Sequence, residues 1–442
     1  MTGDRKNTGR WHTIGLPCLA LALCGTVFGQ QTPAPQPPLH LTLAQAYQLA
    51  VQNNPRFSSA RFTAAAAHQV PNQYRANFQP NVSGALTGVG ADSGSRLAAG
   101  GLNNPVVYNR LGSGLVLSQM ITDFGRTANL EGSARLHAQA QDQASEFTRS
   151  QILLNTGTAY FAVLRAQAVL AVAQKTVEAR QLVVDQVTAL AESKLKSQLD
   201  VKFADVNLSD AKLLVTQAQN DLQAAQANLA AAMGLPNETR FDLAEEPLPA
   251  PLPDRIIDLV RQAMRERPDL KDLRLEQNAQ QRFARAEHDL FYPSVGALAT
   301  AGFAPAGEAA IPGRYGAVGL NVTIPIFNGG LFRARQTEAE LKAKAAAEDI
   351  TDLENRVTRD VRVAYYNATT AYDRMALTSQ MVDQAQQALD LAQSRYDLGL
   401  GNIVELTTAQ LNLTSAQIAD TNARYEYQAQ RINVEYQIGV LR

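Results

Sequence analysis

The sequence has only two cysteines, Cys18 and Cys24, and both lie in an apolar segment near its start. A chain processed after that segment contains no cysteine, which excludes disulfides, thiolate metal sites and cysteine nucleophiles. The histidines beyond the segment are few, and none shows the spacing of a metal-ligand pair. They are His40, His68, His137 and His288. We therefore expect neither a metal site nor a cofactor.

The sequence also lacks an excess of basic residues. It has 40 Lys and Arg against 41 Asp and Glu, and removal of residues 1–29, which hold three basic residues and one acidic residue, leaves 37 against 40 and a net charge of −3. Nucleic acid is therefore not an expected partner. The chain has no nucleophile elbow or P-loop, and the glycines Gly88, Gly90 and Gly94 are followed by predicted strand and loop rather than helix. We predict that the protein is not an enzyme.

An export signal is predicted at residues 1–29. The basic stretch MTGDRKNTGR precedes the apolar run Leu16–Phe28, and small residues suit cleavage before Gln30. The run is too short for a membrane-spanning helix. An uncleaved anchor and lipid attachment at Cys24 stay open as alternatives, although Leu23 is unsuited to precede a lipidated cysteine. Residues 30–40, which include TPAPQPP, are predicted to be a proline-rich tether, disordered or extended.

The remaining sequence contains a tandem repeat. LVLSQMITDFGR, which begins at Leu115, aligns with LNVTIPIFNGGL, which begins at Leu320, at an offset of 205 residues (320 − 115). The front parts align at an offset of 213 (264 − 51), as in VQNNPRF against MRERPDL. We predict repeat 1 at 41–244, a linker at 245–253 and repeat 2 at 254–442. The change of offset indicates a shorter surface loop in the second repeat.

Each repeat is predicted to contain a helix, two strands around a loop, and two very long helices. Strands are expected at about 78–90 and 110–121, and again at about 291–304 and 314–327. The evidence is alternation, because Val318, Leu320 and Val322 share one face and small or polar residues share the other. Runs of about ten residues suit tilted membrane strands. A hairpin of a sandwich would show the same pattern.

The long helices are predicted at about 125–193, 199–233, 330–397 and 403–438. No proline interrupts Leu331–Tyr396, and apolar or small residues recur there every three or four positions. A helix of about 65 residues is roughly 100 Å long. Such helices must pack side by side, as in a coiled coil. On periodicity alone, an antiparallel coiled-coil rod is the alternative.

With these parts in this order, the sequence resembles the TolC-like outer-membrane efflux protein family. The resemblance rests on LTLAQAYQLAVQNNP, on Pro80 and Pro293 at the strand starts, on ITDFGR and IPIFNGG between strand and helix, and on YDLGLGNIVEL. It covers nearly all of the chain beyond the export signal. Each motif is moderately specific by itself, and the duplicated order is highly specific.

The resemblance implies a mainly α fold with membrane β-strands. Four strands are too few to close a barrel, and the family implies a homotrimer. Its long antiparallel helical hairpins form an α-barrel across the periplasm, and its twelve strands form a β-barrel in the outer membrane of a Gram-negative bacterium. The implied function is the exit duct of a tripartite efflux or type I secretion system. Its implied partners are a periplasmic adaptor protein, an inner-membrane transporter and outer-membrane lipid.

In that family, the break between the last two long helices is the closed periplasmic entrance. Here the break contains Gly399 and Gly401. Tyr396 matches the family's gate tyrosine, and Glu405 falls where the constricting carboxylate stands. Asp200 is the equivalent of Glu405 in the first repeat.

Two departures from the family pattern concern this entrance. Gly401 stands where well-known members carry a gate arginine, and Thr408 stands where they carry a second acidic residue. The salt-bridged lock of those members is therefore not carried over whole. A ring of three Glu405 carboxylates remains, which repel one another and could hold a cation. The alternative is that Glu405 only compensates the dipole at the start of its helix.

The two hairpin tips differ in sequence, and we hypothesise that adaptor hairpins dock at both. The candidate residues are Gly399, Leu400, Gly401 and Asn402 in the second repeat, and Lys194, Leu195, Lys196 and Ser197 in the first. Three further glycines, Gly125, Gly329 and Gly330, mark the expected transitions from strand to helix, where glycine gives the backbone freedom.

A second function stays open at this point. An exported coiled-coil scaffold or adhesin without a pore would also use long helices. The two hairpins with matched prolines favour the duct, because a rod does not need them. The sequence gives no indication of the substrate.

Overall fold

The computed structural model describes residues 39–90, 92, 110–235, 241–304 and 313–441. The predicted export signal, residues 30–38 of the predicted tether and Gly94 lie outside these residues. The tether prediction extended too far, because Leu39 and His40 belong to a short strand, β1 Leu39–Leu41. Its backbone pairs in parallel with β4 Phe241–Leu243, which the sequence did not indicate.

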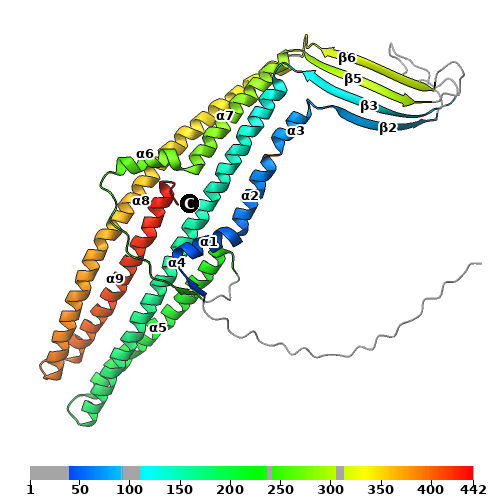
Figure 1. The fold of residues 1–442 in the computed structure, drawn as a ribbon. Helices are drawn as coiled ribbons and strands as arrows, with labels where there is room; N and C mark the ends of the chain where they lie inside the picture. Colours follow the sequence, from blue (N-terminus) through cyan, green and yellow to red (C-terminus); the bar gives the residue numbers. More distant parts are fainter. Residues whose placement is uncertain (1–38, 91, 93–109, 236–240, 305–312, 442) are drawn as a thin grey trace, which may run out of the picture. The chain divides into compact units, whose positions relative to one another are not determined.

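The two repeats have nearly the same order of elements (Figure 1). The first contains α1 Leu43–Asn53, α2 Pro55–Ala67, α3 Val70–Ala76, β2 Asn81–Val89, β3 Arg110–Thr122, α4 Arg126–Glu192 and α5 Gln198–Met233. The second contains α6 Ile256–Glu266, α7 Pro268–His288, the 3₁₀ turn η1 Asp289–Phe291, β5 Ser294–Phe303, β6 Arg314–Thr323, α8 Leu331–Asp397 and α9 Ile403–Gln437. Residues 244–255 between them have no regular secondary structure.

Prolines account for the differences from the predicted elements. The single helix expected at the front of each repeat is divided, because Pro55, Pro71 and Pro268 each stand in the first turn of a new helix. Strand β5 begins after Pro293 rather than at 291. Strand β6 ends at Thr323 rather than at 327, since Pro325 has no N–H to donate to a neighbouring strand.

The strands form one antiparallel sheet in the order β2-β3-β5-β6. Its two outer strands, β2 and β6, leave one backbone edge each without a partner in the described chain. Large apolar side chains project from one face and are exposed, among them Val82, Leu86, Leu115, Val318 and Leu320. The only charged residues of the four strands are Arg110 and Arg314, each the first of its strand.

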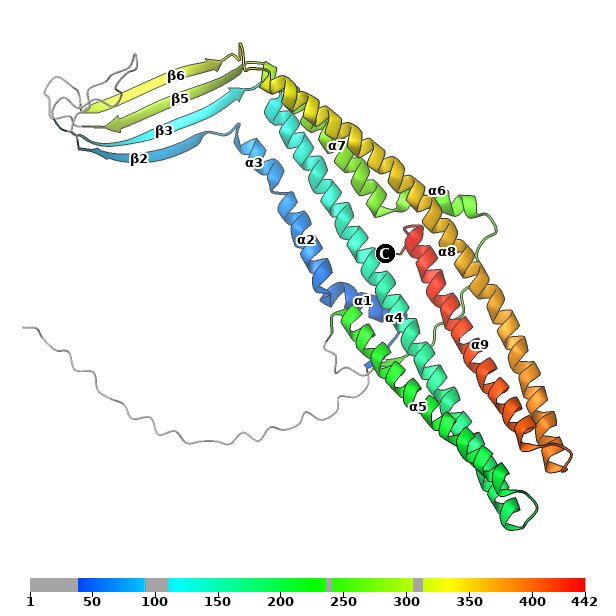
Figure 2. The same ribbon diagram turned by 180° about the vertical axis from the view of Figure 1, so that it is seen from behind.

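The long helices lie side by side (Figures 1 and 2). Helix α4 packs against α5, α7, α9 and the short helices α1–α3, and α8 packs against α7 and α9. Helices α4 and α8 have 67 residues each, a length of about 100 Å. One 18-residue window of α4 is apolar enough for a membrane span, but 44% of it is buried within the protein, as in an ordinary core helix.

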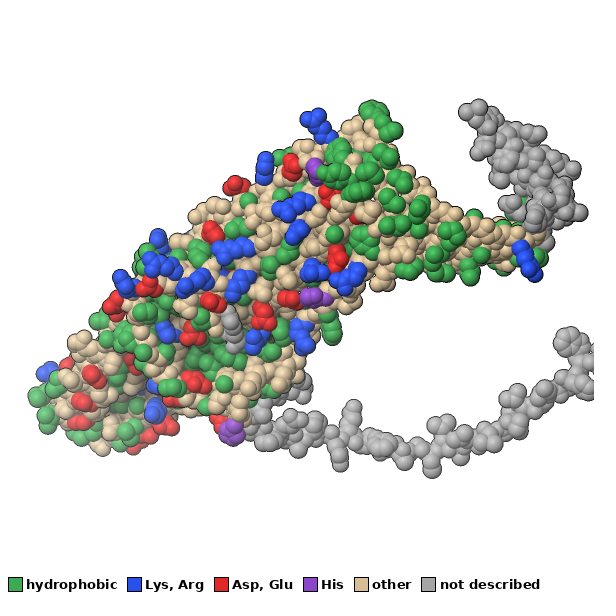
Figure 3. Space-filling model, turned by 45° about the horizontal axis from the view of Figure 1, so that its top comes forward, with side chains coloured by type: hydrophobic (Ala, Val, Ile, Leu, Met, Phe, Trp, Pro, Cys, Tyr) green, Lys and Arg blue, Asp and Glu red, His purple; other side chains and the backbone are tan. Residues whose placement is uncertain are grey.

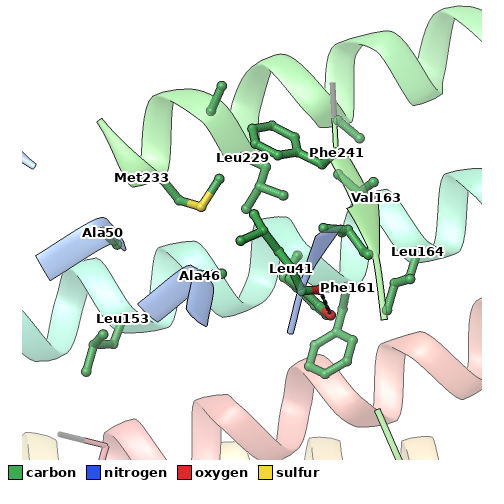
Figure 4. Packing of buried hydrophobic residues seen from close by; sticks show 14 of the residues in the cluster. Leu41, Ala46, Ala50, Leu153, Phe161, Val163, Leu164, Leu229, Met233 and Phe241 are labelled. Carbon is green, nitrogen blue, oxygen red and sulfur yellow. Dashed lines mark hydrogen bonds between the residues drawn. The ribbon is translucent and has the colours of Figure 1, made fainter. Parts of the chain in front are cut away.

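The main apolar core joins α1, α4, α5, α9 and the β1–β4 pair (Figure 4). Leu153, Phe161 and Leu164 of α4 pack there with Leu229 and Met233 of α5. The buried hydroxyl of Tyr160 donates to the carbonyl of Leu41 at 3.1 Å or to that of Ala244 at 2.6 Å. The small β1–β4 pair is thereby fastened to the middle of α4.

The repeat is visible as the same contact in both copies. Gly234 follows α5 with φ +69°, and Gly439, 205 residues later, follows α9 with φ +78°. Each glycine touches the backbone between two short helices so closely that a Cβ atom would lie within 3 Å of it. Beside each glycine a buried side chain binds the helix end. Asn54 donates to the carbonyl of Ala232, and Arg267 donates to the carbonyl of Gln437.

We expect Arg267→Ala to destabilise the fold. Arg267 is buried and also pairs with Asp269 at 2.6 Å, so its removal leaves a partly buried carboxylate without its charged partner and a helix end without its donor. The loss should be about 3 kcal/mol, as for other broken buried pairs. It is measured as the shift in denaturant-induced loss of helical circular dichroism.

The matched control is Arg261→Ala, which breaks an exposed pair with Asp258 on α6. That change should cost less than about 0.5 kcal/mol. Equal effects of the two substitutions would show that the contact at Gln437 does not hold the helix end.

Candidate functional site

The two long hairpins end in turns with the same backbone. In the first, the amides of Leu195 and Lys196 donate to the carbonyl of Leu190. In the second, the amides of Leu400 and Gly401 donate to the carbonyl of Arg395, 205 residues further on. The left-handed residue is Lys194 in one turn (φ 61°) and Gly399 in the other (φ 75°). A lysine in this conformation costs about 1–2 kcal/mol, which glycine avoids.

Gly401 is favoured for a different reason. Its φ is not positive, but a Cβ atom there would lie 3.3 Å from both the Cβ of Arg395 and the amide nitrogen of Tyr396. The turn therefore folds back tightly on the end of α8. In the first repeat the same position holds Lys196, whose side chain crosses to the second hairpin.

A capping residue starts the returning helix of each hairpin. Ser197 and Asp200 form a reciprocal capping box at the start of α5. At the start of α9, the side chain of Asn402 accepts from the amide of Glu405 at 2.8 Å. Asp200 and Glu405 thus occupy the same helical position, as their repeat equivalence predicts.

The carboxylate of Glu405 is held by a residue that the sequence interpretation did not include. The Nε of Arg395 donates to Oε1 of Glu405 at 3.1 Å, and its Nη2 donates to the carbonyl of Leu400 at 3.2 Å. Both partners are partly exposed. This ion pair closes the second turn across its own loop. The sequence signal for this ion pair was the spacing of the two residues, because a tight turn between antiparallel helices brings positions 395 and 405 opposite each other.

Tyr396 lies in an apolar cluster where the tips of the two hairpins meet. We call this the tip cluster; its buried members are Val183, Val187, Val201, Ala204, Tyr396, Ile403 and Leu406, from α4, α5, α8 and α9. The Tyr396 side chain is only 3% exposed. Its hydroxyl has no hydrogen-bond partner among the described residues. The ring therefore acts through packing.

Charged groups of the first tip surround the same ring. The Nζ of Lys196 lies 4.2 Å from the ring centroid of Tyr396, a cation–π contact. Burial raises the pKa of the Tyr396 phenol, and the negative charges of Asp200 and Asp397 raise it further. The structure thus brings Tyr396 together with Lys196 and Asp200, whereas Glu405 pairs with Arg395.

Each tip also exposes a leucine at the same repeat position. Leu195 is 70% exposed and Leu400 is 68% exposed. Both belong to the predicted docking segments. Exposed apolar side chains at an end of the molecule are typical of protein contact sites.

The predicted transitions from strand to helix contain three glycines with positive φ. They are Gly125 (112°), Gly329 (63°) and Gly330 (86°). In the first repeat Phe124 (φ 54°) takes the conformation of Gly329, which the sequence did not reveal. Asp123 supports this turn by accepting from the amide of Thr127 at 2.7 Å. Among the described residues, no cluster of three or more His, Cys, Asp or Glu could hold a metal ion.

Comparison with known proteins finds similarity to outer-membrane efflux and secretion proteins over most of the chain. The sequence profile described as "Outer membrane efflux protein" matches residues 46–235 and 259–440, once within each predicted repeat. The chain is 27% identical to the outer membrane protein TolC of Escherichia coli over 417 residues, 90% of this chain and 82% of TolC. It is 24% identical to the alkaline protease secretion protein AprF of Pseudomonas aeruginosa, over 91% of this chain and 85% of AprF.

Solved structures show the same fold. The CmeC outer membrane channel of Campylobacter jejuni superposes with a TM-score of 0.77 at 18% identity, over 90% of this chain and 85% of CmeC. The outer-membrane channel OprN gives the same TM-score at 20% identity, over 90% of this chain and 89% of OprN.

We expect the ring of Tyr396, not its hydroxyl, to hold the two tips together. Tyr396→Ala removes a buried ring from the tip cluster, a change that typically costs about 3 kcal/mol or more. Hydrogen exchange at the amides of both tips should then be at least tenfold faster. Tyr396→Phe removes a hydroxyl without a partner and should leave exchange unchanged or slower. Faster exchange in the Phe variant would mean that the hydroxyl has a partner in solution.

Proposed function

The chain belongs to the outer membrane efflux protein family, and on that premise we propose that three copies of it form one continuous duct through the outer membrane and the periplasm. As a family member it is an outer-membrane protein with a periplasmic extension that serves efflux or secretion. The relatives are channels and transport proteins, and we infer that this chain conducts rather than catalyses.

The four-stranded sheet carries this proposal. It combines an exposed apolar face, strands whose only charges are at their first residues, and two unpaired edges. Figure 3 shows charged side chains gathered over the helices and hydrophobic ones along the strands. Backbone edges cannot stay unpaired in a bilayer. Three sheets joined edge to edge would close a twelve-stranded barrel, with the apolar face toward lipid.

The helical edges of the protomer support the same assembly. The edge formed by α2 exposes Arg56, Arg61 and Phe62, and residues 41–90 contain no Asp or Glu. The opposite edge, α8, exposes Leu341 among charged residues of both signs, such as Glu340 and Lys342. Exposed apolar side chains on both edges suit head-to-tail contacts around a ring.

The alternative of an exported scaffold or adhesin is less well supported. A coiled-coil rod does not require a β-sheet with one exposed apolar face. It would also leave a large apolar patch in water, which favours aggregation. The sheet therefore favours the duct.

We propose that the hairpin tips form the periplasmic gate. Opening requires the tips to move, and the packing between the hairpins opposes this movement. The Tyr396 ring packs between both hairpins, and the Arg395–Glu405 pair closes the turn beside it. This pair is local to one turn, so it fixes the position of the Glu405 carboxylate rather than joining neighbouring protomers.

We further propose that a periplasmic adaptor protein docks on the tips and connects the duct to an inner-membrane transporter. The exposed residues Leu195 and Leu400 support this, because they occupy equivalent positions on their hairpins. A trimer would therefore expose six leucines at its tips. The polar residues Lys194, Ser197 and Asn402 lie beside them.

The duct and its gate can be tested in planar lipid bilayers. The wild-type protein should show small, mostly closed channels. Tyr396→Ala should raise the open probability at least severalfold, because it removes the packing between the tips. Glu405→Gln in the same recordings should lower cation selectivity if three carboxylates face the pore.

The matched control is Tyr366→Ala, which removes an exposed tyrosine from the middle of the same helix and should not change gating. Conductance that is identical in the wild type and in the Tyr396 and Glu405 variants would retain the duct and exclude this gate. No conductance from folded protein would favour the scaffold.

Docking can be tested separately with Leu195→Asp and Leu400→Asp. A charge at these exposed positions should stop dye efflux from cells that carry the variant as their only copy, while bilayer conductance stays at the wild-type level. Leu213→Asp, at an equally exposed position along α5, is the control and should keep efflux. Normal efflux in the double tip variant would exclude docking at these leucines.

A further inference from the structure

A buried arginine between the main core and the tips forms no direct ion pair among the described residues. Arg180 on α4 is only 6% exposed, and among the described residues it forms no ion pair. Its Nη1 donates to the carbonyl of Asn207 at 2.6 Å, and its Nε has no acceptor. The carboxylate of Asp210 acts on it only electrostatically, and burial lowers the pKa of Arg180. Arginine nevertheless keeps its charge in proteins.

The other buried charges in the described chain are compensated. Arg267 pairs with Asp269, and Glu287 pairs with Arg335 at 2.7 Å. Asp123 accepts hydrogen bonds from the residues that follow it at the start of α4. A buried charge without such compensation costs several kcal/mol. Arg180 is therefore the exception that calls for a partner.

Arg180 lines a cavity of about 180 Å³ between the two hairpins. The cavity is bounded by α4 on one side and by α8 and α9 on the other. Lys175, Gln410 and Gln417 also line it and carry N–H donors, and none of its lining residues is acidic. Its threonines, Thr176 and Thr414, contact each other at 3.3 Å.

We propose that this cavity binds one small free oxyanion, such as phosphate or sulfate, with the Arg180 guanidinium as its main partner. Planar guanidinium groups bind oxyanions through paired, charge-assisted hydrogen bonds. Lys175 adds a second positive charge at the cavity, and the glutamine amides supply neutral donors. The anion would provide the directly bonded charge partner that Arg180 does not find among the described residues.

The position of the site gives the bound anion a structural role. Arg180 belongs to the first hairpin, whereas Gln410 and Gln417 belong to the second. An anion that contacts both would hold the hairpins of one protomer together between the main core and the tip cluster. Anion binding would then oppose separation of the hairpins, in addition to the packing of Tyr396.

The proposal is tested by calorimetric titration of the full-length protein with sodium sulfate at low ionic strength. The wild type should bind one sulfate per chain in a saturable way. Arg180→Gln should weaken binding at least tenfold. Arg165→Gln, which changes an exposed arginine of the same helix outside the cavity, should bind as the wild type does. Because no membrane is needed, the result does not depend on whether the protein conducts.

Two further variants keep the test decisive if Arg180→Gln fails to fold. Lys175→Gln removes a charge, and Ala179→Leu fills space; both positions are exposed and line the cavity. Each should weaken sulfate binding at least threefold without loss of helical circular dichroism. The proposal is overturned if the wild type shows no saturable binding, or if the folded variants keep wild-type affinity. If the site bound a carboxylate of a partner protein and no free anion, the wild type would show no saturable sulfate binding.

Discussion

The structure depends on the sideways packing of two helices that are too long to stand alone. Helices α4 and α8 have 67 residues each, and an isolated helix in water gains little beyond its own hydrogen bonds. Helix α4 is stabilised by neighbours along its length: α3 and α7 near the sheet, α1 and the β1–β4 pair at the main core, and α5 and α9 toward the tips. Helix α8 has fewer neighbours and leaves one side exposed. That exposed side is where a neighbouring protomer would complete the packing.

The two repeats share their backbone conformation, but different side chains interact at equivalent positions. The turns at Lys194 and Gly399 have the same conformation and the same hydrogen bonds, yet only the second has an arginine in place to pair with a carboxylate. Likewise, Asn54 and Arg267 hold equivalent helix ends with different side chains. The side chains of the two tips have therefore diverged on a shared backbone. This asymmetry also explains why Lys196 reaches the Tyr396 ring, whereas its equivalent, Gly401, has no side chain to return the contact.

Two apolar clusters hold the two hairpins of one protomer against each other, and a polar cavity lies between these clusters. The main core is apolar and joins α4, α5 and α9, and the tip cluster is apolar and centred on Tyr396. Between them lies the cavity at Arg180, which is polar and positively charged. Apolar packing is insensitive to salt, whereas a charged cavity responds to the anions around it. The hairpins are thus fastened by packing on either side of the cavity, and the proposed anion would add an electrostatic link between them.

The sequence alone determined the order of the sheet strands and long helices, the repeat, the proline-marked strand starts and the turn positions, because periodicity, proline and glycine act locally. The family resemblance pointed to Tyr396, Glu405 and Asp200, and the structure places all three at the tips. Only the tertiary structure decided their surroundings: the burial of the Tyr396 ring, the pairing of Glu405 with Arg395, the β1–β4 pair and the isolation of Arg180. Each of these depends on contacts between segments that only the folded chain brings together, and no local pattern records such contacts. The sequence says where a helix must break, but the packing of four helices decides what the residues at the break touch.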